Sequence, residues 1–314
     1  MFKRFSFFIV LLYFFSVQCF ALTLSDGTEV SDLVSLVDYG YSKLSLGLEF
    51  SNYKYREVSN EDESEKMRYE DEGGEIMSLT GPKKGFVMEY FLKVFGSKKE
   101  QQSFEVIFLS LQFWYMQGYV KYKGHFDDGT PVEDEDQEKD YYFEYRLLCG
   151  STYSFFNIKS ITETLYLGIG HRHLVNESSY NRVSRYLYVP IGLTTDIKLG
   201  MNWSLIINSE INFLIDGVQN TDFNTKPRSR FIQNAGHGAR LGITANKKLK
   251  KERIFFGPFI RYWDIACSEK LDYYLKEEEK VVEYLHWEPK NYTVEYGFKV
   301  GIDFDYGNGR IWGV

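Results

Sequence analysis

The sequence is poor in cysteine and proline, and it lacks a long apolar run beyond its first 21 residues. Three cysteines in 314 residues exclude a small disulfide scaffold. The missing second apolar run and the negative mean hydropathy exclude a helical membrane protein. What the chain has instead is aromatic residues: 26 Phe, 25 Tyr and 5 Trp make up 18% of it. This content excludes a disordered chain, and the length allows one large or two ordinary domains.

The first 21 residues have the pattern of a secretory signal peptide. Lys3 and Arg4 form a positive start, the segment 5–15 is almost wholly apolar, and Cys19 and Ala21 place small residues before a cleavage site. A membrane anchor and a lipoprotein signal are the alternatives. Cleavage removes Lys3 and Arg4, so the net charge changes from −7 to −9. We predict a signal peptide over 1–21, a periplasmic lead over 22–40 and a membrane domain over 41–314.

Most of the remaining chain alternates between apolar and polar residues with a period of two. In the segment 44–50, three leucines and Phe50 fall on one face, while Ser45, Gly47 and Glu49 fall on the other. This alternation is typical of strands, and it recurs in ten segments. The predicted short connections lie near 96–101, 156–161, 197–202 and 247–252, and the longer ones near 57–75, 124–140, 174–181, 216–234 and 268–290.

Long strands joined by alternately short and long connections are typical of a transmembrane β-barrel. We therefore predict an all-β fold, an up-and-down antiparallel barrel of ten strands. Eight or twelve strands would result if one segment were merged or split. The alternative is a secreted soluble sandwich or solenoid. Two features favour the barrel: glycine and charged residues in the middle of the polar faces, and interface aromatics near strand ends, namely Tyr115, Tyr145, Tyr262, Tyr296 and Tyr306.

The last predicted strand carries a pattern of polar and aromatic residues. Lys299, Gly301, Phe304 and Tyr306 follow the order polar, x, Gly, x, x, aromatic, x, aromatic. This resembles the last-strand signal of bacterial outer-membrane proteins, which the barrel-assembly machinery reads. Such proteins usually end on the final aromatic, whereas residues 307–314 follow here. Trp312 could therefore serve instead, which leaves the register of the last strand open.

A second resemblance covers a short segment in the middle of the chain. Gly168-Ile-Gly-His-Arg-His-Leu is followed by Tyr180-Asn-Arg-Val-Ser-Arg-Tyr-Leu-Tyr-Val-Pro-Ile-Gly192. Together they resemble an uncharacterised, porin-like family of outer-membrane β-barrels in Gram-negative bacteria. The resemblance implies the same fold and the bacterial outer membrane as location, and it implies no known activity.

The polar faces of the predicted strands carry six acids and six bases. Charges away from bulk water are costly unless they are paired. Ten strands enclose an interior slightly wider than the eight-stranded one that side chains fill. We therefore predict a narrow or plugged lumen crossed by salt bridges, with a small ion- or solute-selective channel as the alternative. The predicted lumen network comprises Glu49, Glu89, Lys93, Glu144, Arg146, Arg172, Glu210, Arg240, Arg261, Glu295, Lys299 and Asp303.

Acidic residues are concentrated in three predicted outer loops. Loop 57–75 has nine acids and two bases, loop 126–140 has eight acids and one base, and loop 268–290 has seven acids and four bases. Their net charges are therefore −7, −7 and −3. Such loops keep a surface solvated, and they could also bind Ca²⁺ or Mg²⁺ or attract cationic peptides, although no EF-hand spacing is present. Nucleic acid is disfavoured as a partner, because no basic stripe lies on the predicted outer surface.

Histidines near the predicted outer strand ends raise the question of catalysis. A carboxylate and a histidine can activate water, and the candidate residues are Asp127, Asp128, His171, His173 and His237. The omptin proteases are ten-stranded barrels with such pairs, but their Asp-x-Asp and Asp-x-His patterns are both missing here. The His-x-Ser spacing of outer-membrane lipid hydrolases is missing as well. A metal site at His171 and His173 would need further ligands.

Taken together, these patterns predict an outer-membrane barrel with acidic loops and a charge-filled, narrow lumen. The predicted role is structural or a surface interaction, such as that of a surface antigen. A channel and an omptin-like or lipid-modifying rim hydrolase are the alternatives. The predicted partners are outer-membrane lipid, lipopolysaccharide and the barrel-assembly machinery, and a monomer is favoured. No cofactor is predicted beyond a divalent cation at the acidic loops.

Overall fold

A computed structural model describes ten stretches of the chain. They are residues 41–58, 75–96, 104–125, 130–133, 138–153, 160–177, 180–223, 229–250, 252–277 and 280–307. The predicted signal peptide and periplasmic lead, residues 1–40, lie outside the described residues. No helix within the described stretches is long and apolar enough to span a membrane.

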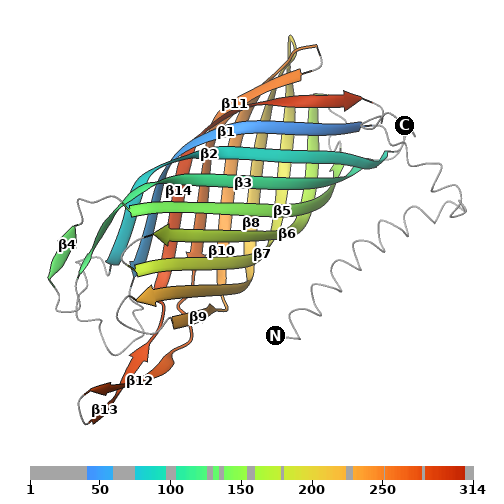
Figure 1. Ribbon diagram of the computed structural model, residues 1–314. Coiled ribbons are helices and arrows are strands. Elements are labelled where there is room, and N and C mark those ends of the chain that lie inside the picture. The colour runs from blue at the N-terminus through green and yellow to red at the C-terminus, as the bar shows by residue number, and fades with distance from the viewer. Residues whose placement is uncertain are drawn as a thin grey trace, which may run out of the picture.

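Ten long strands close into an antiparallel barrel (Figure 1). Each strand pairs with its neighbours in chain order, and the first strand closes the wall against the last. The barrel strands are β1 (Tyr41–Val58), β2 (Glu75–Gly96), β3 (Phe104–His125), β5 (Glu138–Tyr153), β6 (Ile161–Glu177), β7 (Tyr180–Gly200), β8 (Trp203–Phe223), β10 (Gly236–Lys248), β11 (Glu252–Ile265) and β14 (Lys290–Gly307). The predicted fold class and strand number are confirmed.

Four further strands lie at one end of the barrel (Figure 1). β4 (Pro131–Glu133) pairs with β3, and β9 (Ser229–Gln233) pairs with the outer part of β8. β12 (Leu271–Glu277) and β13 (Lys280–His286) form a separate two-stranded hairpin that projects from the barrel. This end also carries the longer connections, so by the general rule for such barrels it faces the outside of the cell.

An apolar belt surrounds the barrel, and we define it by its exposed, outward-facing side chains. Leu48 and Phe50 of β1, for example, are 54% and 53% exposed. Apolar side chains gain nothing from contact with water, so a continuous exposed band of them marks the surface that faces lipid. The belt includes Leu46, Leu48, Phe50, Phe86, Met88, Leu109, Leu111, Leu147, Leu165, Ile191, Leu193, Ile211, Phe213, Leu241, Ile243, Phe256, Ile260, Phe298 and Val300.

The strands continue well beyond the belt on the outer side. β2 and β3 each have 22 residues, whereas a strand needs about 9–11 residues to cross the hydrocarbon. On β1 the outward positions beyond Phe50 are Asn52 and Lys54, which are exposed and polar. The outer part of the barrel is therefore a wall with water outside it.

Two predicted loops prove to be largely strand. The connection predicted at 174–181 is short, because β6 runs to Glu177 and β7 starts at Tyr180. In the same way, β8 continues to Phe223 through the start of the loop predicted at 216–234. In these two segments the outward face is mainly polar, as the inward face is. The alternation of apolar and polar residues that predicts a strand is therefore lost there, although the strand continues.

The tight turns lie at the opposite end, which faces the periplasm by the same rule. Between β7 and β8 the chain reverses through Gly200, Met201 and Asn202, which have φ angles of 88°, 47° and 64°. Glycine and asparagine tolerate this left-handed conformation better than most residues. The turn predicted at 197–202 therefore coincides with this reversal.

Candidate functional site in the barrel lumen

Seven ionised side chains meet inside the barrel and form the charge layer: Glu49, Glu144, Arg146, Glu210, Arg240, Arg261 and Glu295. Alternation along six strands turns each of them inward, and all are buried. On one side of the layer, a guanidinium nitrogen of Arg261 lies 2.6 Å from a carboxylate oxygen of Glu49 and another lies 3.5 Å from Glu295. The ring N–H of Trp114 donates to Glu49 at 3.3 Å, and the hydroxyl of Tyr142 donates to Glu295 at 2.7 Å.

The other side of the layer spans the lumen. Arg240 of β10 pairs with Glu144 of β5 and lies 3.3 Å from Glu210 of β8, which also pairs with Arg146 of β5. The hydroxyl of Tyr188 donates to Glu144 as well. Since β6, β7 and β8 stand between β5 and β10 in the barrel wall, the Arg240–Glu144 pair connects nearly opposite walls.

Arg172 holds an inward position near the layer without a carboxylate partner among the described residues. Its guanidinium is 4.3 Å from the ring centroid of Tyr142 and 5.9 Å from that of Trp263. Its side chain is 2% exposed, and Nε and Nη2 have no hydrogen-bond partner in the described structure. The faces of the two aromatic rings therefore supply the attraction that a cation needs when it is removed from water.

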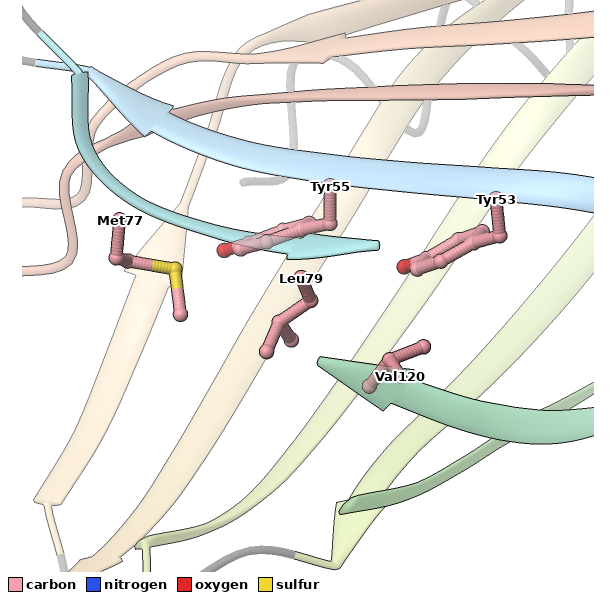
Figure 2. Close-up of a cluster of buried hydrophobic side chains, with 5 residues drawn as sticks. All are labelled: Tyr53, Tyr55, Met77, Leu79 and Val120. Carbon is pink, nitrogen blue, oxygen red and sulfur yellow. The ribbon is translucent and has the colours of Figure 1, made fainter. Parts of the chain in front are cut away.

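Apolar side chains fill the lumen on the outer side of the charge layer. Figure 2 shows one cluster, in which Tyr53 and Tyr55 of β1 meet Met77 and Leu79 of β2 and Val120 of β3. A second cluster comes from the opposite side of the barrel and consists of Tyr186, Tyr188, Leu214, Trp263 and Ile265. We call these two clusters together the outer plug.

A buried lysine joins the outer plug to the wall beside it. Lys83 of β2 forms an ion pair with Asp140 of β5, and its ammonium lies 3.3 Å from the ring centroid of Tyr53. The amide of Asn176 also donates to Asp140 at 3.4 Å. Lys83 is therefore satisfied by a carboxylate and by an aromatic face, as a buried cation requires.

Two carboxylates, Glu57 and Glu288, lie near one arginine at the outer mouth of the barrel. Arg182 of β7 forms an ion pair with Glu57 of β1, and these two strands stand on opposite sides of the wall. The hydroxyl of Tyr55 donates to Glu57 at 2.9 Å and to Glu288 at 3.4 Å. Burial, together with the nearby charge of Glu57, raises the pKa of Glu288 to about 8.

The lumen widens on the periplasmic side of the charge layer into a cavity of about 450 Å³, which we call the vestibule. One wall, from β5 to β10, presents mainly neutral hydrogen-bonding groups, namely Thr152, Thr162, Thr164, Thr194, Asn208, Thr244 and Asn246. The opposite wall presents aromatic rings and charges, namely Lys43, Glu89, Phe91, Phe108, Arg253, Phe255, Lys299 and Asp303. The guanidinium groups of Arg146, Arg240 and Arg261 line its inner end.

The structure divides the twelve charges predicted for the lumen into two groups. Eight of them are the charge layer and Arg172. Of the other four, Glu89 and Asp303 share Lys43, which lies 3.8 Å and 3.9 Å from them. Lys299 lines the vestibule and Lys93 is half-buried. Neither of these two lysines has an ion pair within the described part of the chain.

Several lumen charges were missed by the sequence prediction. Lys43 continues the inward parity of Ser45 and Glu49, so it could have been found. Glu57 and Arg182 also obey the parity of their strands, but Glu57 lies in the predicted loop 57–75 and Arg182 directly follows the predicted loop 174–181. Glu288 follows no strand pattern, because it precedes β14. Its backbone is held at the mouth by Ser268, whose N–H donates to the Glu288 carbonyl and whose hydroxyl accepts from the Glu288 N–H.

The histidines considered for catalysis face away from the lumen. His171 and His173 stack on Tyr145 and Phe143 of the neighbouring strand, with centroids 4.9 Å and 4.6 Å apart. His237 is exposed on the outer wall. None of the three forms an ion pair or a hydrogen bond with a carboxylate in the described part of the chain, and Asp127 and Asp128 lie outside it. In the described part of the chain no group of three or more His, Cys, Asp or Glu is arranged to hold a metal ion.

The glycines of the segment that resembles other outer-membrane barrels have a packing role. Gly170 of β6 lies under the ring of Tyr188 of β7, and Gly192 of β7 lies under the ring of Tyr166 of β6. A Cβ atom at either glycine would overlap the ring. These reciprocal contacts set two large inward aromatic side chains against the wall without a void.

No family model and no curated protein matches this sequence. Among solved structures, the chain is similar to the outer membrane protease OmpT of Escherichia coli, with a TM-score of 0.51 and 11% identity over 86% of this chain and 97% of that one. It also aligns with the translocator domain of the autotransporter NalP from Neisseria meningitidis (TM-score 0.38, 9% identity, 94% and 98% coverage). A further alignment is with the toluene transporter TodX of P. putida (0.29, 7%, 85% and 90%). The likeness to OmpT shows the fold, that of a bacterial outer-membrane β-barrel.

Proposed function

We propose that this outer-membrane barrel is a closed scaffold that conducts no solute and presents its acidic outer loops to the cell surroundings. The observation that carries the proposal is the set of ion pairs that cross the lumen, above all Arg240–Glu144 and Arg182–Glu57. Each joins nearly opposite walls, so each must break before a solute can pass.

The energetics of these pairs favour a permanently closed lumen. Removing one partner of a buried ion pair costs about 3–5 kcal/mol, because the other charge is left without compensation. A passing solute would have to disrupt several such pairs in the charge layer and then displace the aromatic rings of the outer plug. A pore that must open against both barriers is a poor route for diffusion.

The outer half of the molecule supports a role in presentation. The wall continues beyond the apolar belt, and the hairpin of β12 and β13 projects further still (Figure 1). The three acidic loops at this end carry the negative charge, so the proposed partner has a cationic surface or is bridged by divalent cations.

Conductance measurement tests the closed lumen. We expect the folded chain to give no steady current steps in a planar bilayer, and its folding is checked first by heat-modifiable gel mobility. Presentation is tested separately with an epitope tag inserted between Glu277 and Lys280, which we expect to be labelled by antibody on intact cells. Steady steps from the folded protein would refute closure, and a tag that is labelled only after lysis would refute the orientation.

A narrow channel is the second candidate, and the vestibule favours it. This cavity lies between the periplasmic end and the charge layer, so the inner part of the lumen already has room for water and small solutes. Rearrangement of the charge layer and the outer plug under voltage would then complete a pathway. Current steps that appear at high voltage and reverse at low voltage would select this candidate over the closed scaffold.

A further inference from the structure

A group of three lysines stands on the outer wall just beyond the apolar belt. Lys54 of β1, Lys84 of β2 and Lys121 of β3 all face outward and are exposed. In the strand register, Lys54 is opposite Thr80 and Thr80 is opposite Lys121, so these two lysines share one cross-strand row. With strands about 4.8 Å apart, their Cα atoms are about 10 Å apart. We call the three residues the lysine cluster.

Lys84 is the member of this cluster that lies nearest the apolar belt. It is four residues along β2 from Thr80, which is about 13 Å at the rise of a strand, and its cross-strand neighbours are Phe50 and Gln117. The three ammonium groups on flexible stems therefore surround one patch of wall that begins where the hydrocarbon ends.

The lysine cluster has no acidic partner among the described residues, although the chain as a whole is acidic. Other lysines on the outer wall do have acidic partners: Lys139 pairs with Glu177 at 3.1 Å, and Lys290 pairs with Asp264 at 3.4 Å. The described part of the chain places no carboxylate within ion-pair distance of Lys54, Lys84 or Lys121. Within the described part of the chain, their three charges are therefore open to a ligand.

Aromatic rings lie directly beneath and within the cluster. Phe86 is 5.7 Å from Phe113 and 5.9 Å from Tyr115 between ring centroids, and Tyr115 is 6.4 Å from Tyr141. Tyr119, between the row of Lys121 and that of Gln117, is 56% exposed. Aromatic rings of this kind occupy the interface between hydrocarbon and headgroups, so they place the lysines at the level of lipid phosphates.

We propose that the lysine cluster binds the phosphate groups of anionic lipids in the outer leaflet, with the neighbouring aromatic rings against the glycerol or sugar region of the same lipid. The opposite side of the barrel lacks this arrangement among its described residues. There, the outward positions just beyond the belt hold one base, Arg185 of β7, and one acid, Asp216 of β8. The proposal thus predicts one preferred side for anionic lipid rather than an even ring around the barrel.

The test measures binding of fluorescent lipid A to the folded full-length chain in non-ionic detergent micelles. Each lysine near an anionic surface contributes about a fivefold gain in attraction. We therefore expect Lys54→Gln/Lys84→Gln/Lys121→Gln to raise the apparent Kd on the order of a hundredfold. These side chains are exposed, so the variant should fold as the parent does, which heat-modifiable gel mobility checks.

A matched variant separates the site from general charge effects. Lys198→Gln/Lys248→Gln/Lys250→Gln removes the same charge from exposed lysines at the periplasmic end, and we expect its Kd to stay within about twofold of the parent's, given that removing distant exposed charges has little local effect. Equal losses in the two triple variants, or no loss in the first, would overturn the proposal. Complete displacement of lipid A by millimolar inorganic phosphate would also overturn it, because the cluster would then recognise free phosphate and not the lipid.

Discussion

At the scale of single residues, the charge layer is stable because each buried charge has several partners, and not because any one ion pair is strong. Arg240 has two carboxylates, Glu144 and Glu210, while Glu144 also receives the hydroxyl of Tyr188. A charge in this position is stable only because its neighbours replace the water that it lost. The free-energy cost of a substitution therefore depends on what it leaves behind.

The pair Arg240–Glu144 provides the first prediction. Glu144→Leu leaves Arg240 buried with one partner fewer, so we expect it to lower the free energy of unfolding by about 3–5 kcal/mol. The double substitution Glu144→Leu/Arg240→Met removes both charges and should lose clearly less than the two single substitutions combined. Urea-dependent unfolding, followed by gel mobility in the four variants of this cycle, measures the difference. Additive losses would show that the pair is not coupled.

Glycine packing under tyrosine rings provides the second prediction. Gly170→Ala places a Cβ atom into the ring of Tyr188, which must shift, so we expect a loss of about 1–3 kcal/mol in unfolding free energy. Gly242→Ala is the matched control, because its nearest neighbour, a backbone oxygen of Pro258, would be 3.9 Å away. The same urea assay compares the two. An equal response at both glycines would contradict the packing role.

At the scale of elements, the sequence predicts which side chains of a strand face inward better than it predicts where the strand ends. Within the belt the inward and outward positions follow from alternation, which is why Glu49, Arg146 and Arg261 could be assigned to the lumen. In the outer parts of β6 and β8 both faces carry mainly polar residues, so the sequence predicts loops there. Which inward charges pair across the lumen could not be predicted, since it depends on register and on the shear of the closed wall.

The hairpin of β12 and β13 provides the third prediction, because its base is fixed at the carboxylate pair of the outer mouth. Glu288 faces Glu57 and Tyr55 from β1 and Arg182 and Tyr186 from β7, and it follows the hairpin directly. Burial and the charge of Glu57 raise the pKa of Glu288 from 4.5 to about 8. The folded state thus holds a proton that the unfolded state releases at a lower pH.

The sign of the pH effect follows from this proton. Between about pH 4.5 and pH 8 the folded state binds more protons than the unfolded one, so this group's contribution to stability falls as the pH rises. We expect faster hydrogen exchange in β12 and β13 in the parent than in Glu288→Gln at pH 9, and little difference between them at pH 5. Comparing the two proteins at one pH cancels the intrinsic pH dependence of exchange. Identical exchange at pH 9 would exclude a role for Glu288 in holding the hairpin.

At the scale of the whole molecule, the barrel consists of three levels along its axis. The vestibule lies at the periplasmic end, the charge layer follows, and the outer plug and the Arg182–Glu57 pair lie in the outer half. The apolar belt surrounds the inner levels, while water surrounds the outer wall. The proposed closure thus consists of two barriers in series that differ in chemistry.

Barriers in series give the last prediction. Glu144→Ser/Arg240→Ser removes the ion pair that crosses the charge layer but leaves the aromatic rings of the outer plug in place. Tyr186→Ser/Trp263→Ser removes two rings of the outer plug but leaves the charge layer in place. Because current must pass both levels, we expect each double variant to stay silent in a planar bilayer and the fourfold variant to conduct. Gel mobility confirms folding before each recording. Conduction by the charge-layer variant alone would show that the outer plug is no barrier to ions, and silence of a folded fourfold variant would show that side chains beyond these two levels close the lumen.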